Sequence, residues 1–202
     1  MKSGSQLPLH DRLKLTGGCL LILLSCTAAA PERLHYRIDP PASAAKARVA
    51  FMGIAGKTVH FEKISGTVTF KPGNLQSLDI DVTIDAATLS ATDSFTEKRL
   101  KGSDFFDVSR YPTVTFSAEK LVMTDKTSGK LIGRLTARGI TRPVTLAVRF
   151  SLPPATARGG ERFQMSGVTT IDRRDFGMNA YALIVGRSVK ISISASLTGK
   201  DG

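Results

Sequence analysis

In Val189-Lys-Ile-Ser-Ile-Ser-Ala-Ser-Leu-Thr198, apolar and polar residues alternate at every position. Successive side chains of a β-strand point to opposite faces of its sheet, so this alternation predicts a strand with one apolar and one polar face. The apolar face comprises Val189, Ile191, Ile193, Ala195 and Leu197.

The same period of two recurs along the chain. It covers 78–85 and 144–152, and further strands are expected at about 34–39, 46–52, 58–70, 113–123, 130–138 and 163–172. Turn-forming residues separate them at 71–74, 125–129 and 158–160, and 139–143 is expected to form a tight hairpin link. Strands that are apolar on one face only are typical of antiparallel sheets. The pattern therefore predicts an all-β fold, an extended eight-stranded antiparallel β-barrel, because closure removes exposed edges.

A helical crossover is expected to interrupt the strands. The sequence Ser94-Phe-Thr-Glu97 fits a capping box, which predicts a short helix through about Lys101. It lies within a long connection from Ala86 to Tyr111. In the same connection, Asp104-Phe-Phe-Asp107 is expected to form a plug whose phenylalanines insert beneath the crossover.

The N-terminus has the features of an export signal. A basic stretch precedes the apolar segment from Leu15 to Ser25, which is too short to span a bilayer. We therefore divide the chain into an export signal (1–25), a short linker (26–33) and the barrel domain (34–199).

Two ways of cleaving this signal are open. Leu23-Leu-Ser-Cys26 is similar to a bacterial lipobox, which predicts a lipidated Cys26 and a membrane-anchored periplasmic lipoprotein. The alternative is ordinary cleavage within Thr27-Ala-Ala-Ala30, which would give a soluble periplasmic protein. Both cysteines, Cys19 and Cys26, lie in this region, so the domain that follows cannot contain a disulfide, a zinc–thiolate site or a thiol nucleophile.

The sequence lacks the residues that several classes of enzyme require. Gly53 to Thr58 resembles a phosphate loop, but Phe51 stands where the first glycine is required. There is no Gly-x-Ser-x-Gly motif, and His35 and His60 have no neighbouring catalytic set. We therefore predict no catalytic residue, no metal and no cofactor, and we interpret Asp79, Asp81 and Asp85 as a solvated strand face.

The net charge of +11 favours anionic partners. The basic residues are scattered and no groove of stacking aromatics is evident, so we predict no nucleic-acid partner.

The interior of such a barrel is either filled by its own side chains or able to hold a small ligand. Aromatic residues make up only 6% of the chain, and many inward positions are small or medium-sized. These positions are Ala118, Gly133, Ala137, Gly167, Thr169 and Ala195. The composition is compatible with both a cavity and a solid core.

Three segments together resemble the YceI-like family of polyisoprenoid-binding, lipocalin-like periplasmic proteins. They are Ser103 to Phe116, Leu135 to Leu146 and Thr170 to Met178, and Tyr36-Arg-Ile-Asp39 and the last strand also fit. The resemblance covers about 34–199. It implies an eight-stranded barrel whose apolar tunnel takes an isoprenoid chain, such as a quinone tail or a polyprenyl lipid. Glu97-Lys-Arg99 departs from the Asp-x-His pair of many relatives.

The predicted ligand-lining residues are apolar and lie on the inward strand faces. They are Phe51, Phe61, Phe70, Leu78, Ile80, Val82, Phe116, Leu135, Leu146, Val148, Phe150, Phe163, Met165, Ile171, Ile191 and Ile193. Arg173 and Arg174 are candidates for contacting a headgroup, because a guanidinium pairs well with phosphate or quinone oxygens. Alternatively, an Arg–Asp pair pins the strand end, with Gly177 allowing an unusual backbone angle.

The sequence thus favours an exported, non-enzymatic protein that holds or carries an isoprenoid lipid. An enzyme acting on a lipid inside the barrel, or a filled barrel that interacts through its surface, are the alternatives.

Overall fold

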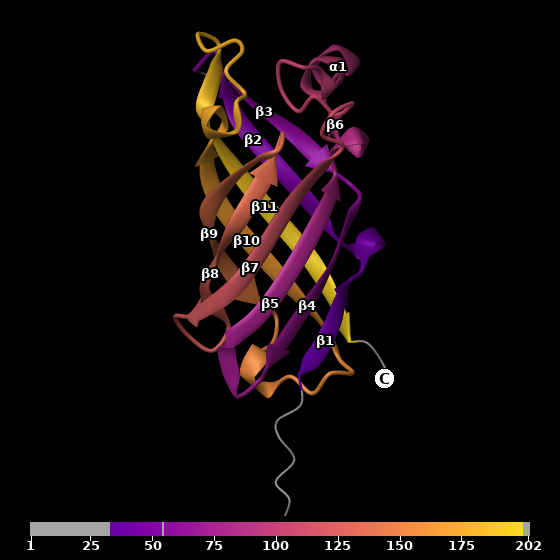
Figure 1. Ribbon diagram of the computed structural model, residues 1–202, viewed down its shortest axis with the longest axis vertical. Helices are drawn as coiled ribbons and strands as arrows, with labels where there is room; N and C mark the ends of the chain where they lie inside the picture. The colour runs from indigo at the N-terminus through magenta and orange to yellow at the C-terminus, as the bar shows by residue number, and fades with distance from the viewer. Residues whose placement is uncertain (1–32, 54, 200–202) are drawn as a thin grey trace, which may run out of the picture. The chain divides into compact units, whose positions relative to one another are not determined.

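The computed structural model describes residues 33–53 and 55–199, which form an antiparallel β-barrel (Figure 1). β1 pairs with β4 on one side and with β11 on the other, so the ring closes without a free edge. This confirms the predicted eight-stranded antiparallel barrel. In order around the ring, the strands are β1 (Leu34–Ile38), β4 (Ile64–Lys71), β5 (Asn74–Asp85), β7 (Thr113–Met123), β8 (Ser128–Ala137), β9 (Ile140–Phe150), β10 (Arg162–Asp172) and β11 (Val185–Gly199).

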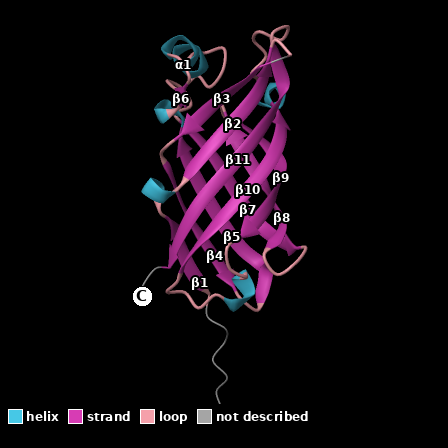
Figure 2. Ribbon diagram, turned by 180° about the vertical axis from the view of Figure 1, so that it is seen from behind, coloured by secondary structure: helices cyan, strands magenta, loops and turns pink. Residues whose placement is uncertain are grey.

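Three further strands continue the sheet from β11 at one end of the barrel (Figure 2). They are β2 (Ala44–Phe51), β3 (Ala55–Phe61) and the short β6 (Ser90–Ala91). β1 and β2 occupy successive parts of the same edge of β11, residues 197–199 and 185–194 respectively. The two strands therefore follow one path along β11, interrupted by the 3-10 turn at Pro40–Ala42.

Ser43 holds this interruption together. Its Oγ accepts a hydrogen bond from Ser196 N at 3.0 Å and donates to Asp39 O at 2.7 Å, while Asp39 N donates to Ser196 O at 2.8 Å. Ser43 and Ser196 are both buried. The hydroxyl thus replaces the backbone pairing that β11 loses where the strand breaks.

The largest differences from the predicted strand boundaries are a break within one strand and the position of one turn. The single strand expected at 58–70 is wrong, because it is divided into β3 and β4 at the exposed Glu62 and Lys63. β3 pairs with β2 and β4 with β1, so this break mirrors the one between β1 and β2. The turn expected at 139–143 is instead Arg138-Gly139, where both residues have positive φ (50° and 72°), as a two-residue hairpin turn requires.

The crossover helix lies at the predicted residues, but its N-cap is a different residue from the one predicted. α1 spans Ser94–Lys101, and its N-cap is Asp93, whose carboxylate accepts from Thr96 N at 2.7 Å and Thr96 Oγ1 at 2.9 Å. The predicted capping box on Ser94 is therefore wrong. Aspartate is as good a cap as serine, and here it reaches the backbone from one residue earlier.

The end of the barrel opposite α1 is filled by aromatic side chains. Tyr36 stacks on Phe70 (centroids 5.6 Å apart) and meets Phe163 edge-on at 4.9 Å. Its hydroxyl donates to Glu161 Oε1 at 3.0 Å and accepts from Gly159 N at 3.1 Å. We call this end of the barrel the closed end.

In the described part of the chain, no helix has the length and apolar character to cross a membrane.

Burial, reinforced by the nearby Glu161, raises the pKa of Tyr36 from its ordinary 10.0 to about 12. The stability that the neutral phenol contributes is then fully present below pH 10 and is lost as the pH rises through 12. We expect the free energy of unfolding to fall in this window, as measured by urea titration at several pH values. Tyr36→Phe should be about 1–2 kcal/mol less stable at neutral pH and lose less stability in the alkaline window. An equal alkaline loss in Tyr36→Phe would contradict this origin.

Candidate ligand-binding cavity

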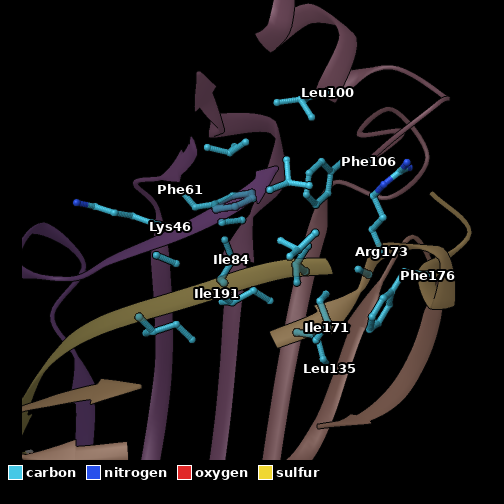
Figure 3. Close-up of a pocket in the computed structure, with 18 of the residues that line it drawn as sticks. Lys46, Phe61, Ile84, Leu100, Phe106, Leu135, Ile171, Arg173, Phe176 and Ile191 are labelled. Atoms are coloured by element: carbon cyan, nitrogen blue, oxygen red, sulfur yellow. The ribbon is translucent and has the colours of Figure 1, made fainter. Parts of the chain in front are cut away.

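A cavity of about 480 Å³ occupies the barrel at the end that carries α1. This volume is within the range of small-molecule sites, roughly 300–1,000 Å³. Strands from all around the barrel contribute to its wall, and most of the side chains that reach it are apolar. Figure 3 shows Phe61 and Phe106 facing each other below Leu100, and their rings meet edge-on at 5.6 Å.

Most of the predicted ligand-lining residues surround this cavity. Those that line it are Phe51, Phe61, Ile80, Val82, Phe116, Leu135, Leu146, Met165, Ile171, Ile191 and Ile193. The structure thereby brings together residues from β2, β3, β5, β7, β8, β9, β10 and β11. Their contact with a ligand stays a prediction.

Five of the predicted residues do not reach the cavity. Phe70, Leu78, Phe150 and Phe163 pack together at the closed end, and Val148 is buried nearby. They lie on the inward face, as expected, but nearer the closed end than the cavity. Of the small inward residues, Ala137, Thr169 and Ala195 line the cavity and Ala118, Gly133 and Gly167 do not.

Sequence reasoning missed the lining residues outside the regular strands. α1 and the segment after it contribute Phe95, Leu100, Phe105 and Phe106, and the β10–β11 loop contributes Tyr181 and Ile184. The plug expected at 104–107 indicated two of these phenylalanines. No periodicity marks the others, because a loop side chain is directed by its tertiary contacts.

Polar side chains gather where the cavity meets α1. Lys57 Nζ lies 3.4 Å from Asp93 Oδ2, and Arg99 donates to the Tyr181 hydroxyl and lies 3.9 Å from Asp104 Oδ2. The hydrogen bonds from Thr96 lower the pKa of Asp93, and Lys57 adds to this effect. The cavity is therefore apolar in its depth and charged at one end. An amphipathic ligand would be oriented by this difference.

Arg173 and Arg174 have different surroundings. Arg173 is only 3% exposed and lines the cavity, and its guanidinium donates to the carbonyls of Met178, Val185 and Gly186. Its burial lowers its pKa. Arg174 is exposed and lies 3.5 Å from Asp172, and Gly177 ends this turn with a φ of 73°. This geometry makes Arg173 a support of the β10–β11 loop, and headgroup contact by either arginine stays a prediction.

No group of three or more His, Cys, Asp or Glu side chains suited to a metal ion occurs among residues 33–53 and 55–199. Asp79 and Asp81 are exposed on β5, and Asp85 caps the next turn by accepting from Ala87 N at 3.0 Å. The predicted lipidation site, Cys26, lies outside the described residues.

The barrel matches a known protein family over nearly its whole length. Residues 36–197 match the YceI-like domain. The chain belongs to the YceI-like family. It is similar to a UPF0312 protein of Vibrio parahaemolyticus, with 30% identity over 80% of this chain and 85% of the relative. A UPF0312 protein of Vibrio vulnificus is 28% identical over 78% of this chain and 85% of the relative.

Solved structures share the YceI-like fold at lower identity. BcnA of Burkholderia cenocepacia superimposes with a TM-score of 0.70 and 24% identity, over 79% of this chain and 98% of its own. A polyisoprenoid binding domain from Saccharophagus degradans gives a TM-score of 0.63 and 14% identity, over 82% of this chain and 98% of its own. At these identities the comparison establishes the fold of the YceI-like chain.

The role of Arg173 can be tested by its effect on stability. Arg173→Met removes the donor to three backbone carbonyls, and we expect the free energy of unfolding in urea to fall by about 2–3 kcal/mol. The matched change Arg174→Met removes one exposed ion pair and should cost less than about 1 kcal/mol. Equal losses in the two variants would refute a supporting role for Arg173.

Proposed function

We propose that this YceI-like protein binds an isoprenoid lipid, of quinone or polyprenyl type, with its apolar chain inside the cavity. The observation that carries the proposal is the distribution of polarity: the cavity is apolar in its depth and has Lys57, Asp93 and Arg99 at one end. A ligand with one long apolar part and one polar end fits this arrangement. A structural neighbour described as a polyisoprenoid binding domain supports the same ligand class.

The energetics need no polar recognition in the depth of the barrel. Burial contributes about 0.8 kcal/mol per methylene, so an isoprene unit would contribute roughly 3–4 kcal/mol before its ordering cost. Phe61, Phe116 and Met165 offer large or adaptable apolar surfaces to such a branched chain. A few buried units suffice for tight binding.

The proposal is for binding without chemical conversion, and it requires no cofactor. Lys57 is paired with Asp93, and Arg99 with Tyr181 and Asp104, so these groups serve as fixed charges near a headgroup. The lipid is the ligand, held or carried by the barrel.

Two adjacent alanines of β2 allow a matched test. Ala45 is buried and lines the cavity, whereas Ala44 is exposed on the other face. Ala45→Phe should fill part of the cavity and reduce the co-purified lipid at least tenfold, while Ala44→Phe should leave it unchanged. Native mass spectrometry of protein purified without detergent, followed by organic extraction, measures the lipid and identifies it.

The outcome distinguishes the alternatives. A wild-type protein without any bound mass, even after incubation with isoprenoid lipids, would refute the proposal. Equal lipid in both alanine variants would place the ligand elsewhere than in this cavity.

We further propose that the chain is exported to the periplasm and held at the membrane through a lipidated Cys26. The supports are the basic and apolar signal-like segment and the Leu23-Leu-Ser-Cys26 sequence. Cys26→Ser should move the protein from the membrane fraction to the soluble periplasmic fraction, measured by fractionation and immunoblotting. If the wild type is already soluble, ordinary signal cleavage replaces the lipoprotein proposal.

A further inference from the structure

Exposed apolar side chains gather at the end of the barrel where the cavity lies. Of the nine large hydrophobic residues that are exposed in the described part of the chain, five are at this end. Leu183 is fully exposed (100%), Phe95 and Met52 are 68% and 65% exposed, and Tyr181 and Ile184 are about 40% exposed. Burying such residues is favourable, so a group of them around one opening indicates a surface that contacts an apolar partner.

These five residues, which we call the rim, come from three segments that contact one another: the β2–β3 turn, α1 and the β10–β11 loop. Met52 N in the β2–β3 turn donates to Ile184 O in the β10–β11 loop at 2.7 Å. The guanidinium of Arg99 in α1 lies 5.3 Å from the ring of Phe95 and 5.6 Å from that of Tyr181. These contacts link the three segments, which lie at the same end of the barrel (Figure 1).

The rim is continuous with the cavity. Phe95, Tyr181 and Ile184 belong to the rim and also line the cavity. An apolar chain that leaves a membrane over the rim therefore meets apolar surface before it enters the barrel. Leu183 does not line the cavity, so its exposure is not explained by contact with an internal ligand.

The charge around the rim is positive. The three segments that carry it, 48–58, 93–101 and 177–188, hold six basic residues and two acidic ones. Both acids already have a basic partner, Asp93 with Lys57 and Glu97 with Lys101 at 2.7 Å. Of the other four basic side chains, Arg99 lies 3.9 Å from Asp104 and Arg187 lies 3.3 Å from Asp172. The exposed Arg48 and Lys98 stay available to pair with anionic headgroups.

We infer that the rim docks on the surface of a lipid bilayer that contains anionic lipids, with its apolar side chains inserted among the headgroups. Interfacial protein segments combine apolar insertion with basic side chains in this way. This inference rests on the proposed lipid-binding function and adds the route: the ligand enters from the membrane at the rim, and the closed end points away.

The chain contains no tryptophan, so a single introduced tryptophan reports its own surroundings. We place one at Leu183 in the rim, or at Leu152, which is 47% exposed in the β9–β10 loop at the closed end. Both full-length variants carry Cys26→Ser, so that no acyl chain contributes and the N-terminal segment is identical. The probes are phosphatidylcholine vesicles with and without phosphatidylglycerol, containing brominated acyl chains that quench tryptophan on contact.

We expect a blue shift and quenching of Leu183→Trp on phosphatidylglycerol vesicles, and neither for Leu152→Trp. Association should weaken at least tenfold on pure phosphatidylcholine. Equal quenching at both positions, stronger quenching at Leu152, or no quenching at either would overturn docking through the rim. Equal association with both vesicle types would overturn the anionic partner.

A second pair of variants separates docking from ligand binding. Leu183→Asp should reduce vesicle association at least tenfold. Because Leu183 does not line the cavity, the lipid bound after long incubation with isoprenoid lipid, measured by native mass spectrometry, should still reach the wild-type level. Leu152→Asp should change neither quantity. If Leu183→Asp keeps both its lipid and its vesicle association, docking through the rim is refuted and the proposed function is not. A wild-type protein without lipid would refute the proposed function.

Discussion

Closure of the sheet through β1 is the constraint on which the rest of the barrel depends. β1 has only five residues, yet it pairs with β4 on one side and with β11 on the other. Closure gives every strand of the ring an inside and an outside, which creates an interior that side chains either fill or leave empty. It also explains the length of β11, whose fifteen residues serve β1 near one end and β2 near the other.

The position of the cavity follows from where the large side chains are. At the closed end, Tyr36, Phe70, Phe150 and Phe163 point inward and fill the ring. Toward α1, several inward positions are held by Ala45, Ala137 and Ala195, which leave space that neighbouring side chains do not occupy. The phenylalanines of the crossover then cover this space without filling it. A barrel with an even distribution of large and small residues would have neither a filled end nor a hollow one.

The sequence was sufficient to predict which face of each long strand points inward, because alternation encodes it directly. It predicted the ring, the crossover helix and part of the cavity wall. It did not predict where along the barrel axis a residue lies. For this reason the predicted ligand-lining set includes Phe70 and Val148, which do not reach the cavity, together with Phe61 and Leu146, which do. The break at Glu62 and Lys63 was also hidden, since it depends on the partner strands. The sequence does not reveal the rim, because the residue type alone does not distinguish an exposed leucine such as Leu183 from a buried one such as Leu197.

The two ends of the barrel impose a geometric condition on the proposed membrane contacts. The described chain begins at Arg33, at the closed end, whereas the rim lies at the other end. The residues from Cys26 to Arg33 span at most roughly 25 Å when fully extended. The fifteen residues of β11 rise about 50 Å along the strand, or roughly 38 Å along the axis for a typical tilt of about 40°. An upright barrel anchored through Cys26 therefore cannot place its rim on the bilayer that holds the anchor. A lipidated form would either lie flat on that membrane or present its rim to a second one, whereas a soluble form is free of this condition. Under the two proposals, the state of Cys26 thus determines which membrane the rim can reach.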